Sequence, residues 1–327
     1  MQASELDYIK NIKKSRHREY ALYQIMDHFL GRKNVFKLLG GRRRKFFNGL
    51  KNEMSQGREG IVRHIDRRKD LSFEEFRQHY VKKRIPVVFE GVASDWKCCQ
   101  EWSMEYFKTL HGEDEIVRVN QNKMEEDYFT STLSEVLTKI QQGDDDYCRF
   151  YALLERHPEH VKDFDFNWLI KHRIFKSVFE AFQVFIGGTN SETVLHNANQ
   201  SNLFTQVYGE KKWMLIPNYY TPVIDPSPIN SIYRGAPYKS EDKPFDPFNP
   251  NFDPPYDLFR YVDMYEATLK PGDVLWNPPF FWHAVKNLSP SIGVGYRWIS
   301  PFYCLQTSAL YSLLDLFAVN PPIWKSY

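Results

Sequence analysis

Hydrophobic residues recur at helical spacing in the first part of the chain. They predict one helix over 4–30 that ends at Gly31, and a second over 42–54 after a turn at Gly40 and Gly41. The N-terminal part is therefore expected to be a helical segment.

Short helices and strands follow between residues 70 and 120. Ser72 opens a capping box ahead of one helix, and Ser103 caps another. Residues 85–91 and 116–119 have the apolar, β-branched character of short buried strands.

From about residue 180 the hydrophobic period changes to two. Short apolar segments alternate with turns at 187–188, 209–210 and 270–273, as in an antiparallel barrel or sandwich. Residues 217–255 interrupt this pattern with 10 of the 19 prolines. Because a connection this long is seldom passive, we expect the insertion 217–262 to pack over the barrel mouth, where it could bind substrate or cover the site.

Composition narrows the class of protein. The 327 residues are 42% hydrophobic and 26% charged, which excludes a disordered chain, a collagen and a coiled-coil rod. The chain contains no apolar run long enough to cross a membrane, and its start lacks the apolar core of a secretory signal. Four cysteines without zinc-site spacing indicate a reduced, cytoplasmic protein.

Charge is distributed unevenly. Residues 1–70 hold 18 Lys and Arg against 8 Asp and Glu, a net of +10, so the rest of the chain carries −8 of the total of +2. The basic part is either an arm for nucleic acid or another acidic partner, or a solvated helical surface docked on the acidic body. The lack of regularly spaced aromatic residues there favours the second alternative.

Two of the ten histidines stand out. His196 ends an apolar strand, and His283 lies in an aromatic strand shortly after the turn at 270–273. Either could be a core imidazole, but on two strands of one barrel they could converge as metal ligands.

With these two histidines, the chain resembles a known family, the cupin-like JmjC oxygenases, which include the asparaginyl hydroxylase of the hypoxia-inducible factor. The matching motifs are Pro-Val-Val-Phe-Glu-Gly at 86–91, the segment 193–203, Tyr-Gly-Glu-Lys-Lys-Trp at 208–213, and Lys-Pro-Gly-Asp to Phe-Trp-His at 270–283. The resemblance covers about residues 70–300 and implies a mainly β fold with added helices (α+β), with a double-stranded β-helix (cupin/jelly-roll) core that holds Fe(II) and 2-oxoglutarate.

The resemblance also implies roles for individual residues. His196 matches the first iron-binding histidine and His283 the distal one. Lys211, with Lys212 as the alternative, matches the cation that binds the far carboxylate of 2-oxoglutarate, because a buried carboxylate needs a paired cation. Thr193 is placed to give that carboxylate a hydroxyl bond.

Two further residues, Asn202 and Tyr296, match positions that usually face the pocket and contact the cosubstrate. Asn202 could equally be a turn or capping residue.

The chain departs from the family where the iron-binding carboxylate should stand, two residues after His196. Ala198 occupies that position and has no ligand atom. Asn197 and Asn199 are the residues directly before and after Ala198. On a regular strand their side chains would point to the face opposite that of His196. A strand bulge could still turn Asn199 toward the metal.

Three accounts of Ala198 are open. In the first, chloride fills the vacant position, as in iron-dependent halogenases of the wider superfamily, and the product is halogenated. In the second, iron binds through two histidines, cosubstrate and water, or the site is degenerate and only binds. In the third, Ala198 is an engineered replacement of a native aspartate, and the chain is an inactive form of a hydroxylase.

We therefore expect an Fe(II)/2-oxoglutarate oxygenase, a hydroxylase or halogenase, that acts on an unactivated C–H bond of an amino acid, peptide or protein. The expected layout is a basic helical segment at 1–70, the barrel domain at 71–300 and a tail at 301–327. Within the tail, an amphipathic helix at 305–318 packs on its own barrel or forms a homodimer interface.

Overall fold

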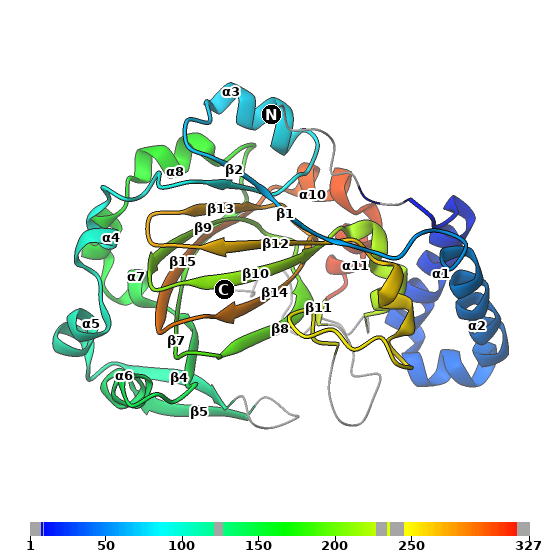
Figure 1. Ribbon diagram of the computed structural model, residues 1–327, viewed down its shortest axis with the longest axis horizontal. Coiled ribbons are helices and arrows are strands. Elements are labelled where there is room, and N and C mark those ends of the chain that lie inside the picture. The colour runs from blue at the N-terminus through cyan, green and yellow to red at the C-terminus, as the bar shows by residue number, and fades with distance from the viewer. Residues whose placement is uncertain (1–7, 9, 121–126, 227–233, 236–244, 319–327) are drawn as a thin grey trace.

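Two facing β-sheets form the centre of the molecule (Figure 1). The computed structural model describes residues 8, 10–120, 127–226, 234–235 and 245–318. One sheet has the order β1 (Val62–His64), β12 (Met264–Leu269), β10 (Lys211–Ile216), β14 (Trp282–Asn287), β8 (Glu192–Asn197) and β11 (Arg234–Gly235). The other has the order β2 (Asp66–Arg68), β3 (Val87–Phe89), β13 (Val274–Asn277), β9 (Ser201–Tyr208), β15 (Ser291–Ile299), β7 (Phe179–Gly187), β6 (Tyr147–Tyr151), β4 (Glu115–Asn120) and β5 (Asp127–Thr132).

The predicted jelly-roll core is confirmed, and its interior explains the strand pattern. Alternate side chains of the two sheets point inward and form a buried cluster that includes Phe204, Trp213, Leu215 and Leu275. The opposite face of the nine-stranded sheet packs against helices through a second cluster, which is why β15 is buried along its whole length.

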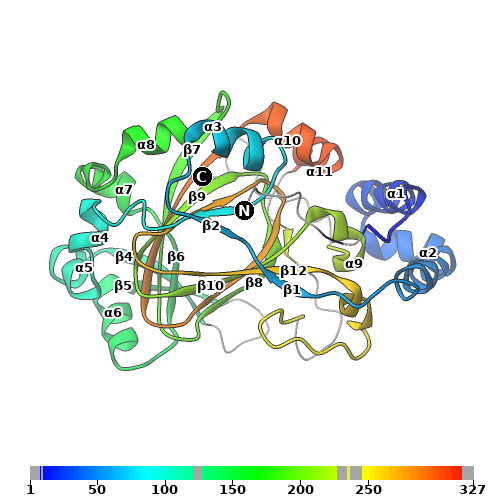
Figure 2. The same cartoon turned by 45° about the horizontal axis from the view of Figure 1, so that its top comes forward.

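Short helices cover the outer face of the nine-stranded sheet (Figure 2). They are α3 (Phe73–Glu75), the π-helix η1 (Phe76–Val81), α4 (Lys97–Glu101), α5 (Met104–His111), α6 (Leu133–Gln141), α7 (Leu153–Arg156), the 3-10 helix η2 (Pro158–Asp163) and α8 (Phe166–His172). The predicted capping box at Ser72 and the cap at Ser103 are both present, since each hydroxyl accepts a backbone N–H bond.

Two longer helices, α1 (Lys14–Leu30) and α2 (Arg32–Met54), form a hairpin beside the barrel (Figure 2). Gly31 ends α1 as predicted, with a positive φ of 79° that reverses the chain. The turn expected at Gly40 and Gly41 is wrong, because both lie inside α2. Each glycine costs a helix about 1 kcal/mol, and burial of one face of α2 on the body compensates for this. Of the predicted helix 4–30, residues 1–7 and 9 lie outside the described residues.

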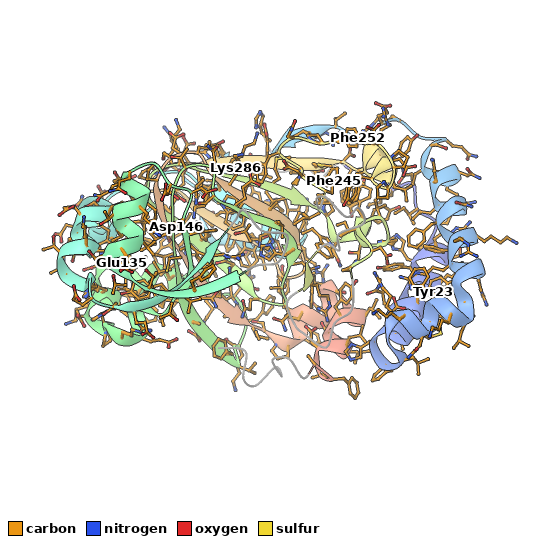
Figure 3. The ribbon with its side chains drawn as sticks, turned by 90° about the horizontal axis from the view of Figure 1, so that it is seen from below. Tyr23, Glu135, Asp146, Phe245, Phe252 and Lys286 are labelled. Carbon is orange, nitrogen blue, oxygen red and sulfur yellow. The ribbon has the colours of Figure 1, made fainter. Side chains whose placement is uncertain are left out.

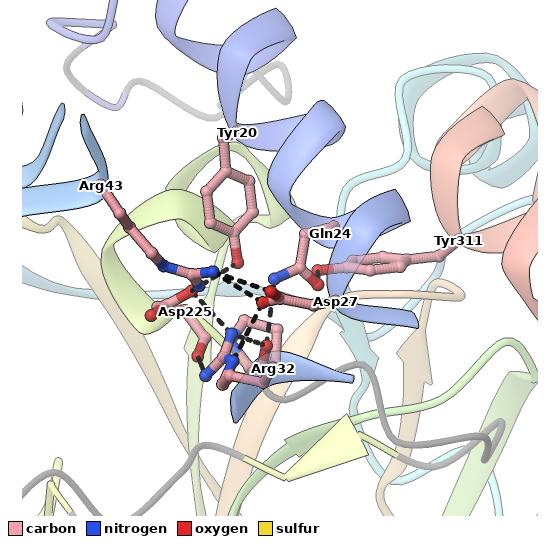
Figure 4. Close-up of polar contacts among 8 residues, drawn as sticks. Tyr20, Gln24, Asp27, Arg32, Arg43, Asp225 and Tyr311 are labelled. Atoms are coloured by element: carbon pink, nitrogen blue, oxygen red, sulfur yellow. Dashed lines mark hydrogen bonds and ion pairs between the residues drawn. The ribbon is translucent and has the colours of Figure 1, made fainter. Parts of the chain in front are cut away.

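A buried ion-pair cluster fastens this hairpin to the body (Figure 4). The Arg43 guanidinium, 1% exposed, lies 2.7 Å from an Asp27 oxygen and 2.9 Å from an Asp225 oxygen. Arg32 also pairs with both carboxylates. Part of the basic charge of residues 1–70 is therefore used in docking, as the second alternative predicted.

The segment between β10 and β12 lies between barrel and hairpin. Its described elements are the 3-10 helix η3 (Asn218–Tyr220), α9 (Thr221–Ile224), β11 and the 3-10 helix η4 (Asp257–Tyr261). Phe245 and Phe252 lie on the side that faces α1 and α2 (Figure 3), and Phe245 belongs to a buried cluster shared with both helices. Residues 227–233 and 236–244 of the predicted insertion lie outside the described residues.

The predicted boundaries at residue 70 and within the tail differ from the structure. β1 and β2 precede residue 70 yet pair with β12 and β3, so the barrel begins earlier. The tail forms two helices, α10 (Pro301–Thr307) and α11 (Ala309–Asp315), and Tyr311 and Leu314 are buried on their own chain. In the part of the chain that the structure describes, no helix combines the length and apolarity needed to cross a membrane.

Candidate active site

The two candidate metal ligands lie side by side inside the barrel. β8 and β14 pair antiparallel with His196 directly opposite His283, and the ring centroids are 4.2 Å apart. The two histidines are therefore neighbours inside the barrel, and their role as metal ligands stays a prediction.

Hydrogen bonds orient both rings. Nδ1 of His196 is 2.8 Å from the Val194 carbonyl oxygen, and Nδ1 of His283 is 2.9 Å from that of Phe281. A carbonyl only accepts, so each Nδ1 carries the proton and each Nε2 keeps the lone pair that a metal requires. Burial, with a smaller contribution from the charge of His196, holds the pKa of His283 well below its usual value, so this ring is neutral at pH 7.

A β-bulge brings Thr193 to the same pocket. Thr193 pairs with Val285 while His196 pairs with His283, so β8 has one residue more than β14 over this stretch. Strict alternation would place Thr193 and His196 on opposite faces, but both line the pocket. Thr193 also shares a hydrogen bond with the buried phenol of Tyr147.

Lys211 is completely buried in this pocket. Its side chain is 0% exposed, and its Nζ has no hydrogen-bond partner among the described residues. Aromatic rings lie close to it, with Nζ 5.3 Å from the ring centroid of Phe204 and 5.7 Å from that of Tyr147. Burial lowers the pKa of Lys211 from 10.5 to about 7.

Strand geometry distinguishes Lys211 from the alternative, Lys212. Successive residues of β10 point to opposite faces of the sheet, and Lys212 lies outside, paired with Glu266 at 2.7 Å. Lys211 is therefore the lysine that can meet a ligand in the pocket.

Two arginines that the sequence analysis missed, Arg149 and Arg297, complete the lining. With Lys211 they bring three cationic side chains beside the histidines, and no carboxylate is found among the described lining residues. The remaining volume of about 30 Å³ is close to that of one water molecule. A dicarboxylate can enter only if long side chains move aside.

The structure describes no third protein ligand at the histidines. Ala198, 9% exposed, follows β8 and accepts a backbone bond from Phe280 at 2.7 Å. The Asn199 amide donates to Asp315 of α11 at 3.0 Å, so Asn199 faces the C-terminal helices and does not line the pocket. Within the described residues, no group of three His, Cys, Asp or Glu side chains is arranged to hold a metal.

The two further cosubstrate candidates differ in position. Asn202 lies on the same face of β9 as the pocket-lining Phe204 and pairs with Arg297 across the sheet. Tyr296 does not line the pocket, because its hydroxyl donates to Glu180 at 2.6 Å and its ring packs in the outer cluster. The apolar alternation along β15 could have indicated this, since Val294 and Tyr296 share the outer face and leave Arg297 inward.

Comparison with known proteins identifies the family. The model of the cupin-like domain matches residues 73–303. Lysine-specific demethylase 8 of Xenopus tropicalis is 26% identical over 236 residues, 69% of this chain and 51% of the relative. JmjC domain-containing protein D of Dictyostelium discoideum is 25% identical over 268 residues, 74% of this chain and 57% of the relative.

A third relative has a different name. The tRNA wybutosine-synthesizing protein 4 of Gibberella zeae is 27% identical over 253 residues, which cover 66% of this chain and 22% of that protein. The chain thus spans about half the length, or less, of these curated relatives. The fold, the paired histidines and the matched domain together show that the chain belongs to the cupin-like JmjC family of Fe(II)/2-oxoglutarate-type oxygenases.

Proposed function

We propose that this chain is an Fe(II)/2-oxoglutarate-dependent oxygenase that modifies a C–H bond of a peptide or protein. In this proposal His196 and His283 hold the iron, and Lys211 binds the far carboxylate of 2-oxoglutarate. The observation that carries the proposal is Lys211, a fully buried ammonium without a partner among the described residues, in one pocket with two oriented imidazoles.

Each residue has a physical role in this scheme. Imidazoles whose Nδ1 donates to a backbone carbonyl offer Nε2 to a metal. Lys211 supplies the charge that a carboxylate needs in a dry pocket, and Thr193 supplies a hydroxyl beside it. Iron and 2-oxoglutarate, when bound, supply the oxidising chemistry.

Lys211 also makes the affinity for 2-oxoglutarate depend on pH. With its pKa near 7, the free lysine is partly neutral at pH 7, and a bound carboxylate raises that pKa again. Binding of 2-oxoglutarate therefore takes up a proton above pH 7, and the affinity falls as the pH rises.

The place left by Ala198 is proposed to be filled by an external anion, with chloride as the candidate. Arg149, Arg297 and the protonated form of Lys211, with no carboxylate among the described lining residues, give the pocket a positive charge that attracts an anion. If chloride occupies the position, halogenation becomes an available outcome; if water does, the outcome is hydroxylation.

A second candidate function is a degenerate pocket that binds a dicarboxylate and has lost the chemistry. The observation that favours it is the lack of a third metal-binding side chain at His196 and His283 among the described residues, together with Arg149 and Arg297 beside them. Succinate release under oxygen, with Fe(II) and candidate peptides, separates the enzyme from the binder.

The test of the cosubstrate site is calorimetry with 2-oxoglutarate, with and without a divalent metal. Lys211→Met should abolish binding, whereas the matched control Lys212→Met, on the outer face of the same strand, should leave it unchanged. Equal affinity in the wild type and Lys211→Met would refute the assignment.

A further inference from the structure

A second and larger pocket opens between the N-terminal segment and one end of the barrel. Its volume is about 870 Å³, enough for several side chains of a bound ligand. One wall is formed by α1 and the residues before it, and the other by residues next to β10 and β14.

The lining of this pocket has one sign of charge. Its basic residues, with one histidine, are Lys10, Lys14, His17, Arg18, Lys83 and Arg84, and no acidic residue occurs among the described lining residues. Low-dielectric walls that carry one sign of charge focus the field and attract the opposite charge. An anionic ligand would lower the repulsion among these groups.

Part of this charge, on one face of α1, is left without ion pairs among the described residues, in contrast to the other face of the helix. On that face Arg16 pairs with Glu53 at 3.1 Å. Lys14 and Arg18, one turn apart and both exposed, make no ion pair with any carboxylate that the structure describes. The first turn of α1 also lacks the acidic residues that usually favour a helix N-terminus, so the helix dipole adds to the positive potential.

The pocket lies next to the segments that lead to the candidate iron ligand His283. Phe281 lines it, and the carbonyl of the same residue accepts the hydrogen bond that orients His283. Pro217, also in the lining, directly follows β10, whose last residue pairs with the first residue of β14. A peptide held here would contact Phe281, two residues before the candidate iron ligand His283.

We propose that this pocket binds an acidic segment, a run of Asp and Glu, in the protein substrate and so presents a neighbouring residue to the site at His196 and His283. The inference rests on the proposed function in taking the occupant to be the substrate. It adds a substrate class: protein segments rich in carboxylates.

The aromatic lining favours a peptide over a nucleic acid. Tyr8 and Tyr219 pack on each other, with ring centroids 5.4 Å apart. The Tyr219 hydroxyl is also engaged, because it accepts the backbone N–H of Ile12 at 2.6 Å and donates to its carbonyl at 2.9 Å. Rings fixed in this way do not offer the open faces on which single-stranded bases stack.

The test is fluorescence anisotropy of the full chain with a labelled peptide of Asp, Glu and Gly, measured without iron or 2-oxoglutarate. The variant Lys14→Glu/Arg18→Glu reverses two charges of the pocket. Its matched control, Lys37→Glu/Arg44→Glu, makes the same charge change at exposed positions of α2 outside the pocket.

The acidic peptide should bind the wild type and the control alike, more weakly as salt rises, and at least about ten-fold more weakly in the pocket variant. An uncharged peptide that binds equally well, an equal loss in the control, or an RNA oligonucleotide that binds while the acidic peptide does not would overturn the inference. Because no cosubstrate is present, this result is independent of whether Lys211 binds 2-oxoglutarate.

Discussion

Replacing Lys211 by Met should make the ligand-free protein more stable. The native side chain is an ammonium with 0% exposure and no hydrogen-bond partner among the described residues. Methionine has nearly the same length and fills the same space without a charge. The substitution therefore removes a desolvation penalty and leaves the packing in place.

The size of the gain follows from the pKa. Burial lowers it from 10.5 in the unfolded chain to about 7 in the fold, which at about 1.4 kcal/mol per pH unit corresponds to a penalty of about 5 kcal/mol at or below pH 7. Relaxation of the pocket and entry of water reduce this figure, so we expect a gain of about 2–5 kcal/mol for Lys211→Met.

The penalty also depends on pH. Between about 7 and 10.5 the unfolded chain keeps the proton on Lys211 while the folded chain has released it. The wild type thus gains stability from this group as the pH rises through that window, and Lys211→Met lacks this contribution.

The assay is urea unfolding of both proteins at pH 6.5 and pH 9, without ligands. The difference between Lys211→Met and wild type should be larger at the lower pH. Lys212→Met, which removes only a partly exposed ion pair with Glu266, should change stability by about 1 kcal/mol or less. A Lys211→Met protein less stable than wild type at pH 6.5, or a difference that does not shrink at pH 9, would refute the reasoning.

Three further predictions concern the ligand position, the metal and the helical hairpin. Ala198→Asp places a carboxylate where the family has one, so Fe(II) affinity measured by titration should rise, by roughly ten-fold or more; unchanged affinity would show that the position does not face the metal. His283→Ala should abolish metal binding while the far-UV circular dichroism stays native, and retained Fe(II) affinity would contradict its role. Arg43→Met leaves the Asp27 carboxylate buried without its closest cation, so the free energy of unfolding should fall by about 3 kcal/mol. A thermal midpoint equal to that of wild type would contradict the docking role of this ion pair.

Much of the fold could be predicted because local pattern and global structure agree. The period-two segments after residue 180 became the barrel strands, and the capping serines became helix starts. The turn predicted at Gly40 and Gly41 failed because burial of one face of α2 outweighs the low helix propensity of glycine. Propensity describes single residues, and packing is decided by partners that are distant in the sequence.

Of the residues at the candidate site, some could likewise be predicted from the sequence and others could not. His196, His283 and Lys211 could be placed from the family motifs, and strand alternation then separates Lys211 from Lys212. Arg149 was missed because the sequence does not specify which strands lie beside its own in the sheet. Arg297 was missed although the alternation along its strand places it on the inner face. The basic pocket at α1 likewise combines segments far apart in the chain.

The central claim, that iron and 2-oxoglutarate share the pocket formed by His196, His283 and Lys211, is tested most directly by an anaerobic titration followed in the visible spectrum. Fe(II) and 2-oxoglutarate bound in one site give a weak visible absorption band. We predict that this band forms with the wild type and with Lys212→Met, and is lost in Lys211→Met and His283→Ala. A wild-type protein that gives no band at saturating Fe(II) and 2-oxoglutarate, or a band that persists in both pocket variants, would contradict the account.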